Sequence, residues 1–256
     1  MIGVASTFFW IFLIGFAVSA AFSVKDLNIS FGEPQTAVTA DNKILFSLPI
    51  ILTNNGLYSI RLFNMTTKIS SPTGYNIAKG STFVPAIKRN QEVVAYHNVT
   101  IDVADMLARN QNFLFYDTEF KIIETVSLKV AEVVPVKASL NYTMPWGAPL
   151  YNLAIGNPQF EAFNHTHMKA SVPLGFENHA MFDLAGKVQA RMYDDAGRLR
   201  STGETALNVG QHSTYSGTIE FFVHTSSRVD VPASGYIEVS FQTQLFSYGS
   251  VRIYYE

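Results

Sequence analysis

Two histidines separated by one residue, His165 and His167, have the spacing of a metal site carried on a β-strand. Side chains two residues apart in a strand point to the same side, so both rings could bind one ion, with Glu161 or His179 as a third ligand. The sequence fixes no third ligand, and His165 lies inside the triplet Asn164–Thr166. We therefore expect exposed strand histidines and no metal.

The acidic pair Asp194-Asp195 before Gly197 is a second group that could bind a cation, in this case calcium. A calcium loop of the EF-hand type needs oxygen ligands at alternating positions and a later glutamate, and the sequence lacks that pattern. A hairpin turn with Gly197 at a positive φ accounts for these residues. We expect a turn and no calcium site.

The chain contains no recognisable catalytic motif. Gly-x-Ser-x-Gly, His-Glu-x-x-His and a glycine-rich phosphate loop are absent from the sequence. There is also no cysteine, which excludes disulfides, thiol nucleophiles and thiolate metal sites. Only a triad assembled from residues far apart in the sequence would escape this search. We expect no enzymatic activity and no cofactor.

Charge and composition exclude further classes of function. Lys plus Arg number 18 and Asp plus Glu number 20, which gives a net charge of −2, so we expect no basic surface and no nucleic-acid partner. Charged residues make up 15% of the chain and aromatic residues 13%. This composition excludes a disordered chain and is typical of strands that bury aromatic side chains.

Asn-x-Ser/Thr triplets are the remaining chemical signal, and none of them has a central proline. They mark glycosylation sites in an exported protein, and all of them follow the apolar N-terminal segment. Crowding of Asn and Thr in strands and turns explains such triplets equally well. The candidate asparagines are Asn28, Asn64, Asn98, Asn141 and Asn164.

The elements that carry these residues follow a long internal repeat. Residues 28–35 and 152–159 share Asn, Gly, Pro and Gln at an offset of 124 positions. One residue is lost after position 54, as a single β-bulge in one copy would cause. A repeat this long indicates two tandem copies of one domain. Further matched pairs are Pro49 with Pro173, Asn54 with Asn178, Gly74 with Gly197, Gly80 with Gly203 and Val99 with Ile219.

The two copies are expected at residues 25–142 and 150–256, joined by a bridge at 143–149. Two prolines in the bridge restrict its backbone. Trp146 lies between these prolines. We expect this indole either to set the angle between the domains or to be an exposed contact for a protein partner.

Alternating apolar and polar residues predict strands in both copies. Residues 168–176 and the matching residues 44–52 are apolar at every second position, the pattern of a strand with one packed face and one wet face. Pro49 and Pro173 then belong to an edge strand or a bulge, because proline cannot donate within a ladder. Only residues 102–110 have a helical pattern. The expected fold class is all-β, with two tandem antiparallel β-sandwiches of immunoglobulin-like type behind one N-terminal transmembrane helix.

Residues 1–24 are strongly apolar and contain no charged side chain. As a helix they would reach roughly 36 Å, enough to cross a hydrocarbon core of about 30 Å. The small residues at Val18–Ala21 also suit cleavage of a secretory signal peptide, which is the alternative. We expect an uncleaved anchor in the cell membrane, with a single pass and the bulk of the chain outside the cytoplasm.

The order of elements in the first copy resembles the WHy domain (water stress and hypersensitive response) of the group-2 late-embryogenesis-abundant proteins. Strands of that family end in an Asn-rich turn followed by an aromatic residue, and Asn54, Asn55 and Tyr58 fit this pattern, as do Asn178 and Phe182. The proline of the family's turn is absent from both copies. The resemblance implies a sandwich of about seven strands, no enzymatic activity and a domain held outside a membrane.

These predictions combine into an expected function. We expect a membrane-anchored structural or interaction protein of the cell envelope, which binds a protein partner through the edges and loops of its sandwiches. The alternative is a secreted, stress-protective module that holds a lipid-like or small apolar ligand. That alternative requires an apolar cavity of at least about 300 Å³ inside a sandwich.

Overall fold

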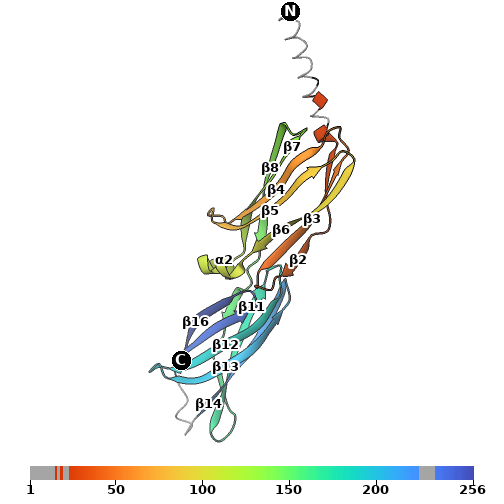
Figure 1. Ribbon diagram of the computed structural model, residues 1–256. Coiled ribbons are helices and arrows are strands. Elements are labelled where there is room, and N and C mark those ends of the chain that lie inside the picture. Colours follow the sequence, from red (N-terminus) through yellow and green to blue (C-terminus); the bar gives the residue numbers. More distant parts are fainter. Residues whose placement is uncertain (1–14, 16–17, 20–22, 225–233) are drawn as a thin grey trace, which may run out of the picture. The chain divides into compact units, whose positions relative to one another are not determined.

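The computed structural model describes residue 15 and residues 18–19, 23–224 and 234–256 (Figure 1). The chain divides into two compact units, which we call the first and second sandwich. The first sandwich consists of Met1–Asp102 and Phe120–Met144, and the second of Val103–Glu119 and Pro145–Glu256. Their sheets confirm the β-sandwich part of the predicted fold class.

The predicted transmembrane helix is wrong. In the parts of the chain that the structure describes, no helix is both long and apolar enough to cross a membrane. This finding also overturns the expected single-pass placement in the cell membrane. Most of residues 1–24, including Ala20 and Ala21 of the candidate cleavage site, lies outside the described residues.

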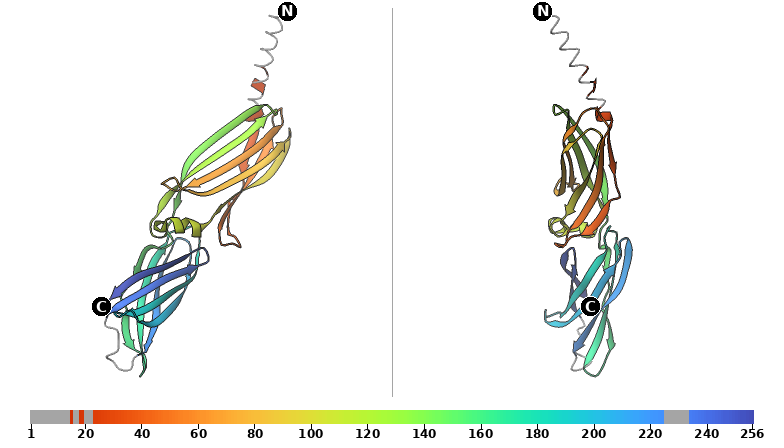
Figure 2. Two further views of the ribbon diagram at one scale, coloured as in Figure 1. Left: turned by 60° about the vertical axis from the view of Figure 1, so that its left-hand side comes forward. Right: turned by 45° about the vertical axis from the view of Figure 1, so that its right-hand side comes forward.

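The first sandwich consists of two layers of strands (Figure 2). In one layer β3 pairs with β6 on one side, while β1 and β2 share its other side. The other layer has the order β5-β4-β7-β8. The bounds are β1 Leu27–Phe31, β2 Gln35–Val38, β3 Ile44–Asn54, β4 Ile60–Ser70, β5 Asn76–Ile87, β6 Gln91–Ile101, β7 Thr118–Val130 and β8 Val134–Trp146.

The second sandwich repeats this topology strand for strand. Strand β11 pairs with β14 on one side and with β9 and β10 on the other, and the second layer has the order β13-β12-β15-β16. Strands β9 to β16 therefore correspond, in order, to strands β1 to β8. The bounds are β9 Tyr151–Ile155, β10 Gln159–Ala162, β11 His167–Asn178, β12 Leu184–Asp194, β13 Leu199–Val209, β14 Ser213–His224, β15 Gly235–Thr243 and β16 Ser247–Tyr255.

The predicted helix at residues 102–110 is confirmed as α2, Val103–Arg109, and the 3₁₀ turn η1, Gln111–Leu114, follows it. Val103, Met106 and Leu107 of α2 are buried. Although α2 and η1 follow β6 in the chain, they group with the second sandwich, whereas the sequence analysis assigns residues 25–142 to one copy.

Pro49 and Pro173 lie in inner strands, not in the predicted edge strands. The carbonyl of Pro49 accepts the N–H of Gly32 at 2.9 Å, and that of Pro173 accepts the N–H of Gly156 at 2.9 Å. In an antiparallel ladder the N–H and C=O of one residue point to the same neighbouring strand. Proline has no N–H, so one ladder hydrogen bond is absent on the side that faces Gly32 or Gly156. The neighbouring strand therefore stops, and β2 and β10 resume after a gap of three residues.

The matched asparagines at the ends of β3 and β11 have the same buried role. The Asn54 amide donates to the carbonyls of Tyr58 and Ile87, and its oxygen accepts the N–H of Gly56. Asn178 donates to Phe182 and Gly210 and accepts from Ala180 in the same way. Both side chains are fully buried. Each one satisfies backbone groups of two loops, which explains why both copies keep it.

Two further predictions from the repeat concern backbone geometry, and the structure confirms both. Gly74 and Gly197 have φ values of 88° and 73° in hairpin turns. The predicted bulge lies at Leu62 in β4, where the pairing with β7 shifts between Arg61 and Asn64. The pairing of β12 with β15 continues without a shift. Gly80, in contrast, lies inside β5 and not in a turn, where a β-carbon would approach the Asn98 carbonyl to 2.6 Å.

The predicted inward faces form the two cores. Ala170, Val172, Leu174 and Phe176 of β11 are buried. On β3, Ile50 and Leu52 are buried and belong to a cluster with Phe63 and Met65 from the opposite layer. The partly buried residues packed against that cluster include Val134 and Val136 of β8.

Candidate functional site

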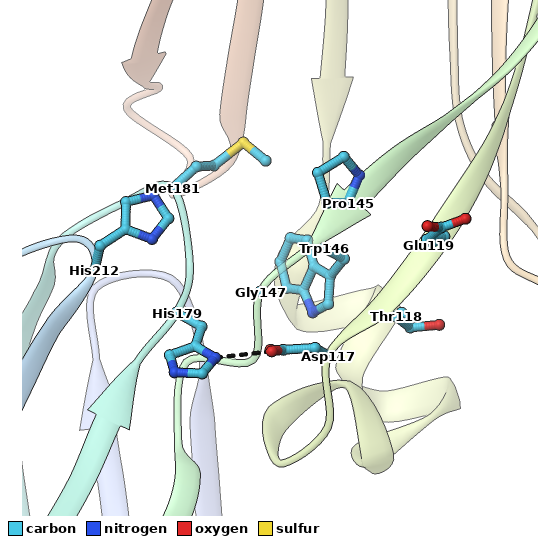
Figure 3. A pocket seen from close by; sticks show the side chains of 9 residues that line it. All are labelled: Asp117, Thr118, Glu119, Pro145, Trp146, Gly147, His179, Met181 and His212. Carbon is cyan, nitrogen blue, oxygen red and sulfur yellow. Dashed lines mark hydrogen bonds and ion pairs between the residues drawn. The ribbon is translucent and has the colours of Figure 1, made fainter.

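The second sandwich contains a cavity of about 730 Å³ whose wall includes Asp117, Trp146, His179, Met181 and His212 (Figure 3). The lining comes from the loops before β7, after β8, after β11 and before β14, together with the start of β7 and the end of β8. Figure 3 shows the His179 ring pointing at Asp117. A histidine directed at a carboxylate is one arrangement of a catalytic general base.

Backbone contacts hold His179 and Asp117 in place. The Asp117 carboxylate accepts the N–H of Ala148 at 2.8 Å, and the N–H of His179 donates to the carbonyl of Ala148 at 3.0 Å. Gly147 precedes this contact because a β-carbon there would collide with the carbonyl of His179. The tight approach of residues 147–148 to residue 179 thus brings together two side chains that are 62 positions apart.

Both ring nitrogens of His179 face carboxylates. Nδ1 lies 2.8 Å from Asp117 and Nε2 lies 3.1 Å from Glu177. The hydrogen bond to Asp117 is the main cause that raises the pKa of His179 above its usual value, with Glu177 adding to it. The Tyr151 ring stacks on the imidazole with centroids 4.2 Å apart.

The two carboxyl groups are held in the ionised form. Burial acts to raise the pKa of Asp117, but the Ala148 N–H and His179 outweigh it and lower that pKa. Asn152, followed by His179, lowers the pKa of Glu177. An imidazole that donates from both nitrogens has no lone pair with which to accept a proton or bind a metal. With both ring nitrogens protonated, His179 forms a structural ion pair with Asp117 and Glu177.

The structure separates the histidines that the sequence analysis combined. His165 lies exposed in the turn before β11, and the ring of His167 packs edge-on against His224 at 5.2 Å. In the described part of the chain, no group of three His, Cys, Asp or Glu side chains could hold a metal. Asp194 occupies the predicted hairpin turn, where its carboxylate accepts the Arg198 N–H at 2.8 Å and pairs with its guanidinium.

Trp146 is buried in the second sandwich. It is 2% exposed, and its Nε1 donates to the carbonyl of Phe113 at 2.9 Å. Its ring lies 5.9 Å from that of Phe182. A side chain enclosed in this way has no free face for a partner, which corrects the expectation of an exposed partner contact.

The candidate glycosylation sites lie on the surface. The Asn164 side chain is tied into its own turn, accepting from the N–H groups of Thr166 and His167. Asn64 is half-buried and accepts from the hydroxyl of Ser81. The other three candidates are exposed in strands, Asn28 in β1, Asn98 in β6 and Asn141 in β8.

A buried polar cluster in the first sandwich was not found from the sequence. His97 is 3% exposed, and its Nε2 and Nδ1 lie 2.8 Å and 2.9 Å from the hydroxyls of Thr67 and Thr82. The Thr67 hydroxyl donates to Glu124 at 3.0 Å. Because a hydroxyl has one proton, Thr67 accepts the hydrogen of His97 Nε2. Burial lowers the pKa of His97, and Glu124 opposes that shift.

The edge strand β8 is the second feature that the sequence did not reveal. It ends the order β5-β4-β7-β8, so within the described residues its outer backbone edge pairs with no strand. Leu140 is 62% exposed and Tyr142 is 43% exposed. Alternate residues of a strand share a side, so both lie on the side of Val134 and Val136, which faces the sandwich interior.

Contacts of Tyr142 agree with this inward direction. Burial, followed by the charge of the buried-cluster residue Glu124 and a hydrogen bond to it, raises the pKa of Tyr142. On the opposite layer, Phe46 and Leu48 are half-buried, whereas the matching Ala170 and Val172 are fully buried. The interior of the first sandwich is therefore less covered near the middle of β8 than that of the second.

No family model and no curated protein sequence matches the chain. The resemblance to the WHy domain therefore stays a prediction. Solved structures that align with the chain include a red sea bream transglutaminase, at 13% identity over 90% of this chain with a TM-score of 0.30. The chain spans 31% of that protein's length.

Two chaperones align over nearly their whole length. The periplasmic chaperone SfaE is 11% identical, with 88% of this chain and 98% of that one covered and a TM-score of 0.27. The YadV chaperone is 9% identical, with 88% and 99% covered and a TM-score of 0.27. Similarities at this level carry no argument about function.

Proposed function

We propose that this protein is a non-catalytic interaction module that binds an extended segment of a protein partner along β8. The observation that carries the proposal is the exposure of Leu140 and Tyr142 on the inward-facing side of an edge strand. Apolar side chains that face a sandwich interior are normally covered, and exposed ones mark an interaction site.

An added strand would pair with the free backbone edge of β8 and would also cover its exposed inward-facing side chains. The unpaired backbone groups of β8 would pair with those of the added strand, as in other cases of β-augmentation. Every second side chain of the added strand would point inward and pack beside Leu140 and Tyr142. The partner segment is therefore extended and apolar at alternate positions.

The cavity of about 730 Å³ does not favour the ligand-carrier alternative. It exceeds the size of about 300 Å³ that a small ligand requires. However, it is lined by loop residues such as Gly147 and His212 and by the ion pair of His179, and not by the interior of a sandwich. An apolar ligand would have to lie against charged groups there.

Peptide selection tests the proposal. We would select peptides of about ten residues, apolar at alternate positions, for binding to the full chain. Hydrogen exchange would then show which strand the bound peptide protects. We expect protection along β8, and we expect Leu140→Lys to weaken binding by about tenfold or more, because it places a charge in the apolar contact.

The matched control is Val94→Lys, since Val94 is 54% exposed on the outward side of β6 in the same sandwich. This variant should bind the selected peptides as the parent does. Protection of a strand other than β8, equal weakening by both variants, or failure to select any binding peptide would each refute strand addition at this edge.

A further inference from the structure

A row of tyrosines crosses the outer face of the sheet β13-β12-β15-β16. Tyr193, Tyr236 and Tyr254 are direct neighbours on β12, β15 and β16. The rings of Tyr193 and Tyr236 stack with centroids 4.8 Å apart, and Tyr254 follows at 6.0 Å. Tyr254 is 69% exposed. Aromatic rings gathered on the solvated face of a sheet do not contribute to its core, and they are enriched at binding surfaces.

A hollow of about 540 Å³ lies beside this row on the same face. Small residues, Ser240 and Gly249, are paired across β15 and β16 next to a register shift. Longer polar side chains surround them, among them Gln189, Glu204 and Gln242. The hollow thus combines a shallow floor with walls that both donate and accept hydrogen bonds.

The polar groups of the hollow hold one another in position. The Gln242 amide donates to Gln189 at 2.9 Å, and the Gln189 amide donates to Glu204 at 2.9 Å. Lys187 also donates to Glu204, at 2.9 Å. Each amide and carboxylate has further hydrogen-bonding capacity beyond these contacts. A ligand with several hydroxyl groups would meet donors and acceptors that are already oriented.

Arg252 lies between the aromatic row and the hollow, because its partner Glu238 is the next outward-facing residue of β15 after Tyr236. Its guanidinium lies 4.3 Å from the centroid of Tyr236 and donates to Glu238 at 2.7 Å. A hydrogen bond with Tyr254 contributes, after Glu238, to raising the pKa of Arg252. Arg252 and Tyr193 both lie against Tyr236, so Tyr254 presents the exposed ring of the row, and Arg252 separates this ring from the hollow.

The charges of this face select the class of ligand. The carboxylates of Glu204 and Glu238 would repel an anionic ligand, and Lys187, Arg191 and Arg252 would repel a cationic one. The polar walls oppose a purely apolar ligand, because it would leave their groups without partners. A neutral molecule with many hydroxyls and one apolar face meets all of these conditions.

We propose that the outer face of this sheet binds a neutral oligosaccharide. The C–H face of one sugar ring packs on Tyr254, and the hydroxyls of the next ring bind the amides and carboxylates of the hollow. This site is independent of the strand-addition edge, since it lies on the second sandwich and uses an outer face.

Titration calorimetry on the full chain tests this site. The neutral probes are cellohexaose, maltohexaose and N-acetylchitohexaose, and the anionic probe is a heparin hexasaccharide. We expect at least one neutral probe to bind and the heparin fragment not to bind. Tyr254→Ala should weaken that binding by about tenfold and Gln242→Ala by about fivefold, through loss of stacking and of hydrogen bonds respectively.

The matched control is Tyr96→Ala, since Tyr96 is another exposed strand tyrosine, at 59%, and lies on β6 of the first sandwich. It should bind the neutral probe as the parent does. Tyr254 and Gln242 are exposed, so their variants should keep the parent's circular dichroism spectrum. Absence of binding by all three neutral probes, stronger binding of heparin, or equal affinity of the Tyr254→Ala variant and the parent would overturn the proposal.

Discussion

The first and second sandwiches have the same strand order but different interiors. Thr67, His97 and Glu124 of the first sandwich correspond by register to Ala190, Ile219 and Val239 of the second. The three residues of the second sandwich are buried and apolar. The same frame therefore tolerates a buried hydrogen-bonded network in one copy and close apolar packing in the other.

The two copies also expose different surfaces. In the first sandwich, Leu140 and Tyr142 on the inward side of β8 remain exposed, whereas in the second the inward-facing Tyr255 of the equivalent strand β16 is buried. On β16 the exposed aromatic residue is Tyr254, on the outer face. The residues shared by both copies therefore build the common strand framework. The residues that differ determine which side chains each copy exposes.

The largest effect should come from the shared frame. Asn54→Ala and Asn178→Ala each remove three hydrogen bonds to buried backbone groups. We expect each to lower the free energy of unfolding of its own sandwich by about 3 kcal/mol. Hydrogen exchange in urea, read on β4 and β12, measures the two sandwiches separately. A large loss in one sandwich and none in the other would show that the frame is not shared.

An intermediate effect should come from exchanging the cores. Thr67→Val leaves His97 Nε2 and Glu124 without the hydroxyl between them, and Ala190→Thr places a hydroxyl beside the apolar Val239. Each change should destabilise its own sandwich by about 2 kcal/mol. The control is Thr66→Val, because Thr66 lies on the opposite side of β4. Urea unfolding with the same exchange readout checks this, and an unchanged Ala190→Thr variant would contradict it.

The smallest effect should be a difference in pH response. The folded pKa of His97 lies below its usual 6.5, because of burial, so the first sandwich loses stability as the pH falls below about 6.5. The pKa of His179 lies above 6.5, because of Asp117, so its contribution is complete below about 6.5 and is lost as the pH rises through the folded pKa. Tyr142, whose pKa is raised, and Asp117 and Glu177 at His179, whose pKa values are lowered, keep their charge state across this range.

Hydrogen exchange at about pH 7.5 and about pH 5.5 should therefore show opposite changes in the two sandwiches. His97→Gln should remove the change in the first sandwich, and His179→Gln should remove that in the second. Because His179 is one-third exposed, its effect should be the weaker one. Changes of the same sign in both sandwiches would contradict these assignments.

Features of the frame could be predicted from the sequence because they repeat. The match of Asn54 with Asn178, the turns at Gly74 and Gly197 and the bulge near Leu62 all follow from one alignment of the chain with itself. The alignment failed where few residues match. It paired Val99 with Ile219, whereas the strand registers pair Val99 with Phe221, and a slip of two residues leaves every side chain on its correct face.

The surfaces proposed to bind partners could not be predicted in this way. The alternation that places Leu140 and Tyr142 on the inward side is the same for a covered strand and for an uncovered one. The ion pair of Asp117, Glu177 and His179 joins a loop before β7 to the end of β11, and no spacing in the sequence announces that contact. Only the three-dimensional arrangement decides which of these groups have neighbours.

The interruption opposite Pro49 has a consequence for self-assembly. On that side of the first sandwich the outermost strands are five and four residues long, whereas β8 runs for 13 residues. A ladder that joined β8 of one copy to the β1–β2 side of the next would meet its gap after a few residues. The break imposed by the pyrrolidine ring of Pro49 therefore disfavours pairing between these two edges, as short edge strands do in other β-sheet proteins.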